Sequence, residues 1–384
     1  MTNVSIIGVG QTKVKEHWDT SLRHLAWYAI EAALDDAHTT DIDAVFVGNM
    51  LGGELSKQNH LGALVADFAG LRGVEAIRIE AADASGGAAF RQAVLAVESG
   101  LVQTALVVGV EKMTEEMGAP ATAALSTALD ADYETIHGLT LAGMGALLMR
   151  RYMHEYGVDV SDFAGFSVNA HANGALNPLA MYRNRLKPER FAAAPQVAEP
   201  VSLFDMAPGG DGAAAVIVTR HERALDMVPQ PVRVAGSALA TDTLALHDRK
   251  DVLWLAAAER SAKQAMIQAG ISPEDVDLFE LHDSFTVMAA LSLEACGFAA
   301  RGEGWRLARD GEIGRNGRIP VSTFGGLKAR GNPAGATGVY QIVEVALQLR
   351  GQAGDCQVPD ARIGMAQNLG GSGATAVTHI LRVD

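Results

Sequence analysis

The feature that most constrains the fold of this 384-residue chain is an internal repeat. Four segments of the first half recur in the same order in the second half, which favours a duplication over chance resemblance between alanine- and glycine-rich stretches. The pairs are residues 4–10 and 232–238, 33–47 and 265–281, 85–100 and 334–351, and 105–110 and 361–366. The repeat predicts two similar α/β halves that face each other, residues 1–230 and residues 231–384.

The first copy of the repeat has the pattern of a strand, a helix and a second strand. Residues 4–10 are apolar, rich in β-branched side chains and end in glycine, as buried strands do. Residues 21–37 place apolar side chains on one helical face, and residues 44–47 form the next apolar run. This spacing predicts a βαβ unit and therefore a parallel sheet. We also expect the helices that open at Ser85 and Ala334 to lie antiparallel to each other at the centre.

Residues from about 113 to 200 have no counterpart in the second half. They contain two segments with helical periodicity, residues 141–156 and 162–175, and a polar, basic stretch at residues 182–190. A glycine turn and a buried strand follow within residues 204–219. We therefore expect an insertion on the first half.

Composition limits the class of protein and its partners. The formal net charge of −14 argues against nucleic-acid binding. Cys296 and Cys356 are the two cysteines, too few for a disulfide framework or a four-cysteine zinc site, and we expect buried structural thiols. No run of about 20 uncharged apolar residues predicts a membrane span, and the first residues lack the basic region of a targeting segment. We expect a soluble, cytoplasmic protein.

Several common site motifs are incomplete or missing. The Gly-Val-Gly at residues 8–10 follows a strand, but the third glycine of a dinucleotide fingerprint would fall at Lys13. Neither a P-loop nor a G-x-S-x-G nucleophile elbow occurs, which argues against an α/β-hydrolase. Glu280, His282 and Asp283 are metal-ligating types, but one histidine beside carboxylates is more often a hydrogen-bonded group at a strand end. We expect no metal.

Four segments resemble the motifs of the thiolase family, closest to its archaeal-type and sterol-carrier-protein-type members. They are residues 81–88 (AADASGGA), 281–285 (LHDSF), 325–338 (GGLKARGNPAGATG) and 367–373 (QNLGGSG). The resemblance implies a five-layered αβαβα thiolase fold of two similar halves, with an inserted loop domain that covers coenzyme A. It also implies homodimers or homotetramers, and an acyl-CoA C-acyltransferase that takes a CoA thioester as substrate and needs no separate cofactor.

The residues at the family's catalytic positions differ from its usual set. The nucleophilic cysteine of the first motif is replaced by Asp83, and the histidine of the Gly-His-Pro motif is replaced by Asn332. The second catalytic cysteine of the family falls at Asn368 or at Ser284. His282 is the member of the set that this sequence retains.

These replacements argue against thiolysis through an acyl-enzyme. A carboxylate that attacked a thioester would form a mixed anhydride, which lies uphill, and the dipole of the helix behind Asp83 favours its charged, weakly nucleophilic form. Asn332 cannot act as a general base, but its amide can donate to a thioester oxygen. Gly370 and Gly371 match the family's oxyanion glycines, or simply form a tight turn. His282 would act as acid or base, hold a water, or be structural.

Two kinds of function follow, and both involve acyl-CoA. The first is carbon–carbon bond chemistry without a cysteine, similar to the family's aldol-cleaving members that work with a small OB-fold, zinc-ribbon partner. In it, Asp83 or His282 would be the base, and Asn332 with Gly370 would hold the enolate oxygen. The second is a non-catalytic scaffold that binds acyl-CoA.

A basic run in the insertion is the candidate for contact with CoA phosphates. It lies where the family covers CoA, although a solvated basic face explains it as well. The run consists of Arg183, Arg185, Lys187 and Arg190.

Overall fold

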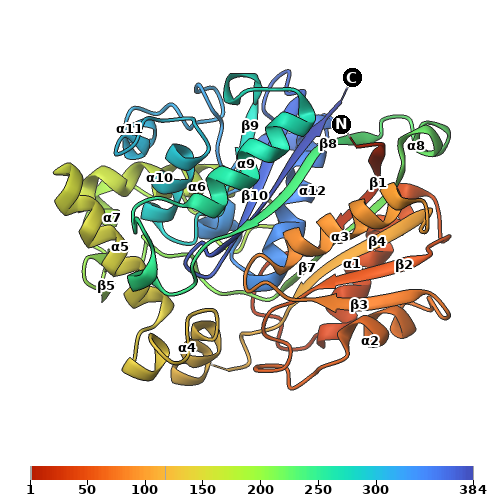
Figure 1. The fold of residues 1–384 in the computed structure, drawn as a ribbon, viewed down its shortest axis with the longest axis horizontal. Coiled ribbons are helices and arrows are strands. Elements are labelled where there is room, and N and C mark those ends of the chain that lie inside the picture. Colours follow the sequence, from red (N-terminus) through yellow and green to blue (C-terminus); the bar gives the residue numbers. More distant parts are fainter. Residues whose placement is uncertain (1, 117, 384) are drawn as a thin grey trace.

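The computed structural model describes residues 2–116 and 118–383 (Figure 1). Its strands are β1 (Val4–Gln11), β2 (Ala44–Gly48), β3 (Glu75–Ile79), β4 (Thr104–Glu111), β5 (Gln196–Ala198), β6 (Val201–Ser202), β7 (Gly212–Arg220), β8 (Val232–Thr241), β9 (Leu278–Glu280), β10 (Ile363–Gly370) and β11 (Thr375–Arg382). Its α-helices are α1 (Leu22–Ala37), α2 (Leu61–Phe68), α3 (Ser85–Ser99), α4 (Ala119–Ser126), α5 (Leu141–Tyr156), α6 (Ala164–Gly174), α7 (Pro188–Ala192), α8 (His221–Met227), α9 (Ala256–Ala269), α10 (Thr286–Ala295), α11 (Gly304–Arg309) and α12 (Thr337–Leu349).

In the described part of the chain, nine strands form one sheet whose two parts have the same topology. The order is β3-β2-β4-β7-β1-β8-β11-β10-β9, so β2-β4-β7-β1 in the first half corresponds to β9-β10-β11-β8 in the second. Within each half the first pair is parallel and the next two pairs are antiparallel. The halves meet where Ser5 and Ile6 of β1 pair antiparallel with Arg233 and Val232 of β8. The expected parallel pairing holds for β2 with β3 and β4 and for β9 with β10, but the sheet as a whole is mixed, because β7 and β11 run antiparallel to their neighbours.

The two parts of this sheet are two of five layers. Helices form the other three, one between the two parts of the sheet and one outside each part. One apolar core joins α1 and α2 to the outer face of the first half. A second core buries α3 and α12 between the two inner faces, and a third packs α9 and α10 on the outer face of the second half (Figure 1). The expected central placement of α3 and α12 is confirmed, and an added Cβ at Gly86 would lie 2.9 Å from the carbonyl oxygen of Gly335.

The duplication is visible in one pair of close backbone contacts. Gly8 of β1 and Gly236 of β8 stand at the same position of their repeats. A Cβ added to Gly8 would lie 2.3 Å from the carbonyl oxygen of Ala33, and one added to Gly236 would lie 2.1 Å from that of Ala265. Ala33 and Ala265 are themselves equivalent in the repeat. Both halves therefore use glycine to bring a helix against a strand, and residues 8–10 need no nucleotide to explain them.

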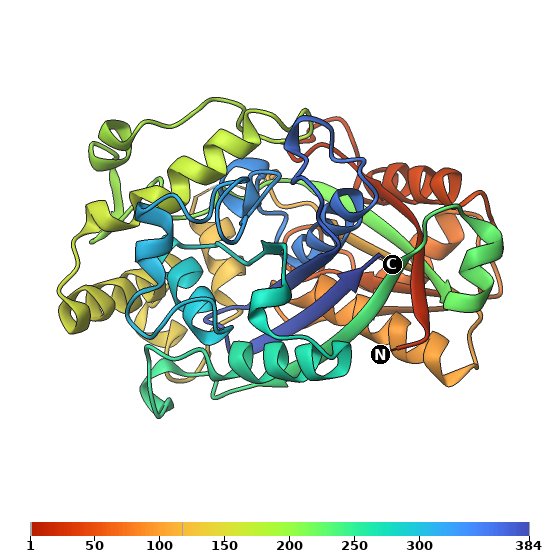
Figure 2. The same cartoon turned by 90° about the horizontal axis from the view of Figure 1, so that it is seen from above.

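The insertion interrupts the first half in sequence, before β7, but packs on the second half. Met149 and Tyr152 of α5 share a core with Phe298 and Trp305, and the hydroxyl of Tyr152 donates to Glu294 at 2.5 Å. Figures 1 and 2 show α5 and α7 on the side of the molecule away from β2 and β3. The limits of the two halves and of the insertion stay a prediction.

No helix in residues 2–116 and 118–383 has both the length and the apolar character needed to span a membrane.

Candidate active site

Asp83 lies in a tight turn between β3 and α3. The hydroxyl of Ser85 accepts from the N–H of Ala81 at 2.9 Å and donates to the carbonyl of Ala82 at 2.5 Å, which closes the turn. Ala82 has a positive φ of 52°, and α3 starts two residues after Asp83. The turn therefore holds the Asp83 carboxyl at the N-terminus of a central helix, where the helix dipole favours a negative charge.

Asp83 borders a cavity of about 330 Å³. Much of its wall comes from the insertion and is apolar, which suits the acyl part of a ligand better than a charged group. The lining residues are Asp83, Met113, Thr122, Leu125, Thr140, Leu141, Ala142, Val197, Ala198, Met206, Ala207, Gly209, Ser284, Phe285, Asn332 and Gly371. The cavity thus joins four of the residues singled out from the sequence: Asp83, Ser284, Asn332 and Gly371.

The Asp83 carboxyl is buried, with 4% of the residue exposed. Loss of solvent raises its pKa from 3.8 to about 6, and the negative charge of Glu80 adds to the rise. Hydrogen bonds from the backbone N–H groups of Gly371 and Asp83 and from the Asn332 side chain oppose the rise. The carboxyl therefore ionises close to neutral pH, which is the property of a general base rather than of a nucleophile.

Asn332 is fixed on three sides. Its backbone N–H donates to the carbonyl of Pro208 at 2.9 Å, and its own carbonyl accepts from the N–H of Gly210 at 3.2 Å. Its side-chain Oδ1 accepts from the hydroxyl of Thr337 at 2.7 Å. Because Oδ1 is engaged in this way, Nδ2 is the group that donates to Asp83.

His282 is neutral, and its hydrogen bonds fix which nitrogen carries the proton. Burial lowers the pKa of His282 to about 3, with a contribution from the positive charge of Arg330. Asn368 Oδ1 accepts from the N–H of Gly87 at 3.2 Å, so Asn368 Nδ2 is the donor to His282 Nδ1 at 3.1 Å. His282 Nδ1 therefore accepts, and the single proton of the ring is on Nε2. In this state Nε2 carries the proton, so it is a hydrogen-bond donor and not a base.

Gly370 and Gly371 lie where β10 turns into β11. Gly370 is the last residue of β10, and Gly371 has a φ of 55°, in the region that favours glycine. An added Cβ at Gly371 would lie 2.7 Å from the carbonyl oxygen of Ala128. Gly371 therefore forms a tight turn, and its N–H also donates a hydrogen bond that lowers the pKa of the Asp83 carboxyl. The oxyanion role of the two glycines stays a prediction.

The basic run lies outside this cavity. Arg183, Arg185, Lys187 and Arg190 are exposed, and none of them lines it. The run starts beside the site, however, because the N–H of Tyr182 donates to the carbonyl of Ala329 at 2.9 Å. Contact of the run with CoA phosphates stays a prediction.

Both cysteines are buried and lie away from the cavity. Burial raises the pKa of each thiol to about 12, which keeps both protonated at neutral pH. Cys296 is within 3.4 Å of the Oε1 of Gln367, and Cys356 is within 3.9 Å of the carbonyl of Asn173. Neither thiol is placed to replace the family's nucleophile.

The carboxylates beside His282, those of Glu280 and Asp283, accept hydrogen bonds from other residues of the chain. Glu280 accepts from the N–H and hydroxyl of Thr323 at 2.7 and 2.5 Å, and Asp283 accepts from the N–H of Leu327 at 2.8 Å. Within the ranges that the structure describes, no three His, Cys, Asp or Glu side chains are grouped as metal ligands would be.

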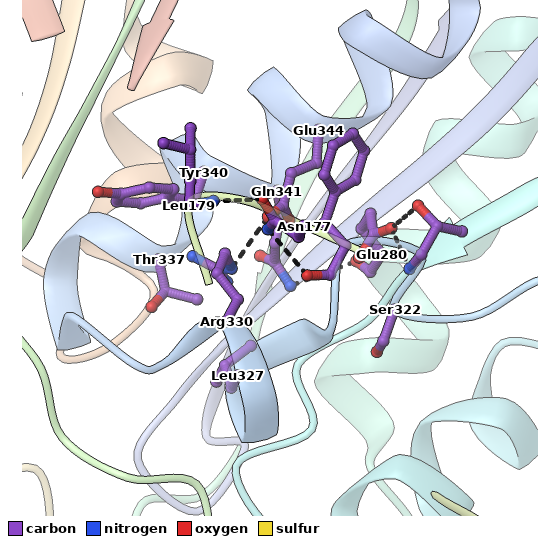
Figure 3. Close-up of polar contacts among 12 residues, drawn as sticks. Asn177, Leu179, Glu280, Ser322, Leu327, Arg330, Thr337, Tyr340, Gln341 and Glu344 are labelled. Atoms are coloured by element: carbon purple, nitrogen blue, oxygen red, sulfur yellow. Dashed lines mark hydrogen bonds and ion pairs between the residues drawn. The ribbon is translucent and has the colours of Figure 1, made fainter. Parts of the chain in front are cut away.

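A buried ion pair next to the site was not anticipated from the sequence. Arg330, two residues before Asn332, pairs with Glu344 of α12 at 3.0 Å and lies over the ring of Tyr340 (Figure 3). Both charged groups are almost fully buried. A sequence signal existed, since Arg330 lies in the glycine-rich motif and Glu344 is the one charged residue of the helix Thr337–Leu349. The pairing itself depends on packing between distant segments.

Comparisons with known proteins agree with this architecture. A thiolase N-terminal domain model matches residues 4–191, and a thiolase C-terminal domain-like model matches residues 238–383. An acetyl-CoA acetyltransferase of Methanothermobacter thermautotrophicus is 44% identical over 382 residues, covering 99% of both chains. The benzoylsuccinyl-CoA thiolase subunit BbsB of Thauera aromatica is 35% identical, covering 96% of this chain and 94% of its own.

Two solved structures share the fold. One, described as the Ltp2-ChsH2(DUF35) aldolase, has a TM-score of 0.87 and 25% identity, and the match covers 100% of this chain and 98% of that one. A monomeric SCP2-thiolase like protein type 1 from Mycobacterium smegmatis has a TM-score of 0.77 and 19% identity, covering 99% of this chain and 77% of that one. From the two domain models and the relatives that match along its whole length, this chain belongs to the thiolase family.

Proposed function

We propose that this protein makes or breaks carbon–carbon bonds of CoA thioesters by aldol chemistry, without a covalent acyl-enzyme. The observation that carries the proposal is the Asp83 carboxyl, which ionises close to neutral pH at the wall of an apolar cavity. The acetyltransferase relative supports a CoA thioester as substrate. The aldolase among the solved structures supports the reaction type.

In the cleavage direction the substrate is a 3-hydroxyacyl thioester. Asp83 removes the proton of the 3-hydroxyl, the bond between C2 and C3 breaks, and an aldehyde or ketone leaves. The electron pair of that bond becomes the enolate of the shorter acyl thioester. Asp83 then returns the same proton to C2, so the reaction balances without any further reactant.

The hydrogen bonds around Asp83 fit this sequence of charges. While Asp83 is ionised, the Gly371 N–H and Asn332 Nδ2 donate to its carboxylate. When Asp83 takes up the proton, the negative charge moves to the enolate oxygen, and the same two donors become available to it. His282 does not line the cavity, so this step uses no group of its ring. Neither asparagine nor neutral histidine has to change its protonation state.

We also propose that the active form is an assembly. The solved aldolase, Ltp2-ChsH2(DUF35), is named as two proteins together, and the relative from Thauera aromatica is named a subunit. The partner proposed here is a small OB-fold, zinc-ribbon protein that binds a homodimer or homotetramer of this chain. The reaction needs no cofactor other than the CoA carried by the substrate.

The test is a direct comparison of two substrates. The protein is incubated with a 3-hydroxyacyl-CoA, and separately with a 3-oxoacyl-CoA plus free CoA, and products are separated by liquid chromatography. We expect a carbonyl compound and a shorter acyl-CoA from the first mixture, their loss in Asp83→Asn, and their retention in the control Asp132→Asn, which changes an exposed carboxylate. Thiolysis of the 3-oxoacyl-CoA that survives Asp83→Asn would overturn the proposal.

The alternative is a scaffold that binds acyl-CoA without turning it over. One observation favours it, since the Asp83 carboxylate already occupies donors that a thioester oxygen would use. Titration calorimetry with acetyl-CoA and a 3-hydroxyacyl-CoA separates the two functions. Binding of either ligand without any product, with and without the partner, would identify a scaffold.

A further inference from the structure

The loop that carries Gly371 is short and rich in glycine. It joins β10 to β11 through the sequence Gly-Ser-Gly-Ala, residues 371–374. Gly371 and Gly373 both have positive φ values, and the N–H of Gly373 donates to the carbonyl of Gly370 at 2.9 Å. A loop with two glycines loses much conformational freedom when it is fixed in one shape.

One buried arginine from a distant part of the chain forms hydrogen bonds with this loop. Arg249 is only 7% exposed and follows the short helix Leu246–Asp248. Its Nη1 donates to the carbonyl of Ser372 at 2.9 Å, and its Nη2 donates to the hydroxyl of Ser372 at 2.5 Å. Its Nε donates to the carbonyl of Thr243 at 2.9 Å. The planar guanidinium thus binds the residue next to Gly371 at two points.

The surroundings keep Arg249 charged and in place. Burial lowers the pKa of its guanidinium, while the negative charges of Asp242 and Glu134 oppose that shift. Glu134 belongs to the insertion and accepts from the N–H of Leu246 at 2.8 Å. The N–H of Asp242 donates to the carbonyl of Ala374, at the far end of the loop, at 2.7 Å. Arg249 is therefore held between the insertion and the second half.

We infer that Arg249 is a positioning residue of the active site: it fixes Ser372 and thereby keeps the Gly371 N–H directed at the Asp83 carboxylate. Without the hydrogen bonds from Arg249 to Ser372, rotation about the backbone of Gly371 and Ser372 would direct the Gly371 N–H away from the Asp83 carboxylate. Only the chemical use of Asp83 rests on the proposed function. The positioning itself can be tested without any substrate.

A thiol at position 83 reports the local donors. In the Asp83→Cys variant the thiol pKa is measured from the pH dependence of alkylation by iodoacetamide, and the two buried native cysteines stay unreactive. Two changes at position 249 are then combined with Asp83→Cys. Arg249→Lys keeps the positive charge but loses the two parallel hydrogen bonds to Ser372, and Arg249→Met loses both the charge and the hydrogen bonds. Loss of one N–H donor to a thiolate should raise the thiol pKa by about one unit and slow alkylation at neutral pH about tenfold.

Glu80, whose negative charge raises the pKa at position 83, is unchanged in all of these variants. Arg350→Met serves as the control, because Arg350 is a buried arginine that pairs with Asp36 away from the cavity. It should leave the thiol pKa where it is. If Arg249→Met does not fold, Arg249→Lys and Ser372→Ala decide the question.

An unchanged thiol pKa in folded Arg249→Lys, or an equal shift in Arg350→Met, would overturn the inference. Since the assay contains no CoA ligand, either result is independent of whether the aldol proposal holds.

Discussion

Replacing Asp83 by asparagine should slow the proposed reaction strongly and stabilise the protein at the same time. The pKa of Asp83 is raised from 3.8 to about 6, so the folded protein holds this proton more tightly than the unfolded chain does. Below pH 3.8 both states are protonated and the carboxyl costs nothing. The penalty grows as the pH rises from about 4 to about 6, and stays constant above that. At roughly 1.4 kcal/mol per pKa unit, the ionised carboxyl destabilises the fold by about 3 kcal/mol at pH 7.

Asn has nearly the same shape as Asp and carries no charge, so Asp83→Asn should recover up to about 3 kcal/mol at pH 7 and almost nothing at pH 4. The assay is urea unfolding of both proteins at one protein concentration between pH 4 and pH 8. Loss of the general base should lower the rate of cleavage by about 10²- to 10⁴-fold. The exposed Asp132→Asn should change neither quantity. A variant that is less stable than the parent at pH 7, or a stability difference that does not vary with pH, would refute the reasoning.

Three further outcomes test the site. Iodoacetamide should leave activity intact, because Cys296 and Cys356 are buried thiols with a pKa near 12; inactivation that substrate prevents would show a catalytic cysteine. Gly371→Ala should weaken acyl-CoA binding by about tenfold or more in calorimetry, because the added Cβ meets a backbone oxygen at a positive φ; unchanged affinity would argue against a role for this turn. The double variant Asp83→Cys with Asn332→His should form an acetyl-enzyme with acetyl-CoA, detected by mass spectrometry, whereas no acetylation of a folded double variant that binds acetyl-CoA would mean that these positions do not face the thioester.

Much of the fold can be predicted from the sequence because the duplication left similar short segments in the same order in both halves. The glycine in the fifth position of each repeat marks where a helix approaches a strand, at Gly8 and at Gly236. The direction of β7 and β11 cannot be predicted in this way, since an apolar strand has the same sequence pattern in a parallel and in an antiparallel pair. The position of the insertion on the second half is equally hidden, because it depends on contacts such as Tyr152 with Glu294, far apart in sequence.

For the site, too, the sequence predicts the residues that lie in local motifs but not the contacts between distant segments. Motif positions were enough to bring Asp83, Asn332, Ser284 and Gly371 to one cavity, since each lies in a short segment whose backbone conformation is local. The roles of His282 and Asn368 required the order of donors and acceptors along a hydrogen-bonded chain. Arg249 lies in no motif, and its contact with the glycine loop joins residues 123 positions apart in the chain. Contacts of this kind come from tertiary packing, which sequence patterns do not encode.

The two replacements at the catalytic positions make physical sense as a pair. A thiolate needs a neighbouring base, and histidine supplies one. A histidine at position 332 beside the Asp83 carboxylate would instead take up a proton and form an ion pair, which would pull the pKa of Asp83 far below neutral and weaken it as a base. Asn332 donates a hydrogen bond without a charge, so the pKa of Asp83 stays near 6. A chain that keeps a carboxylate at position 83 for proton transfer therefore gains from asparagine at position 332, and each replacement favours the other.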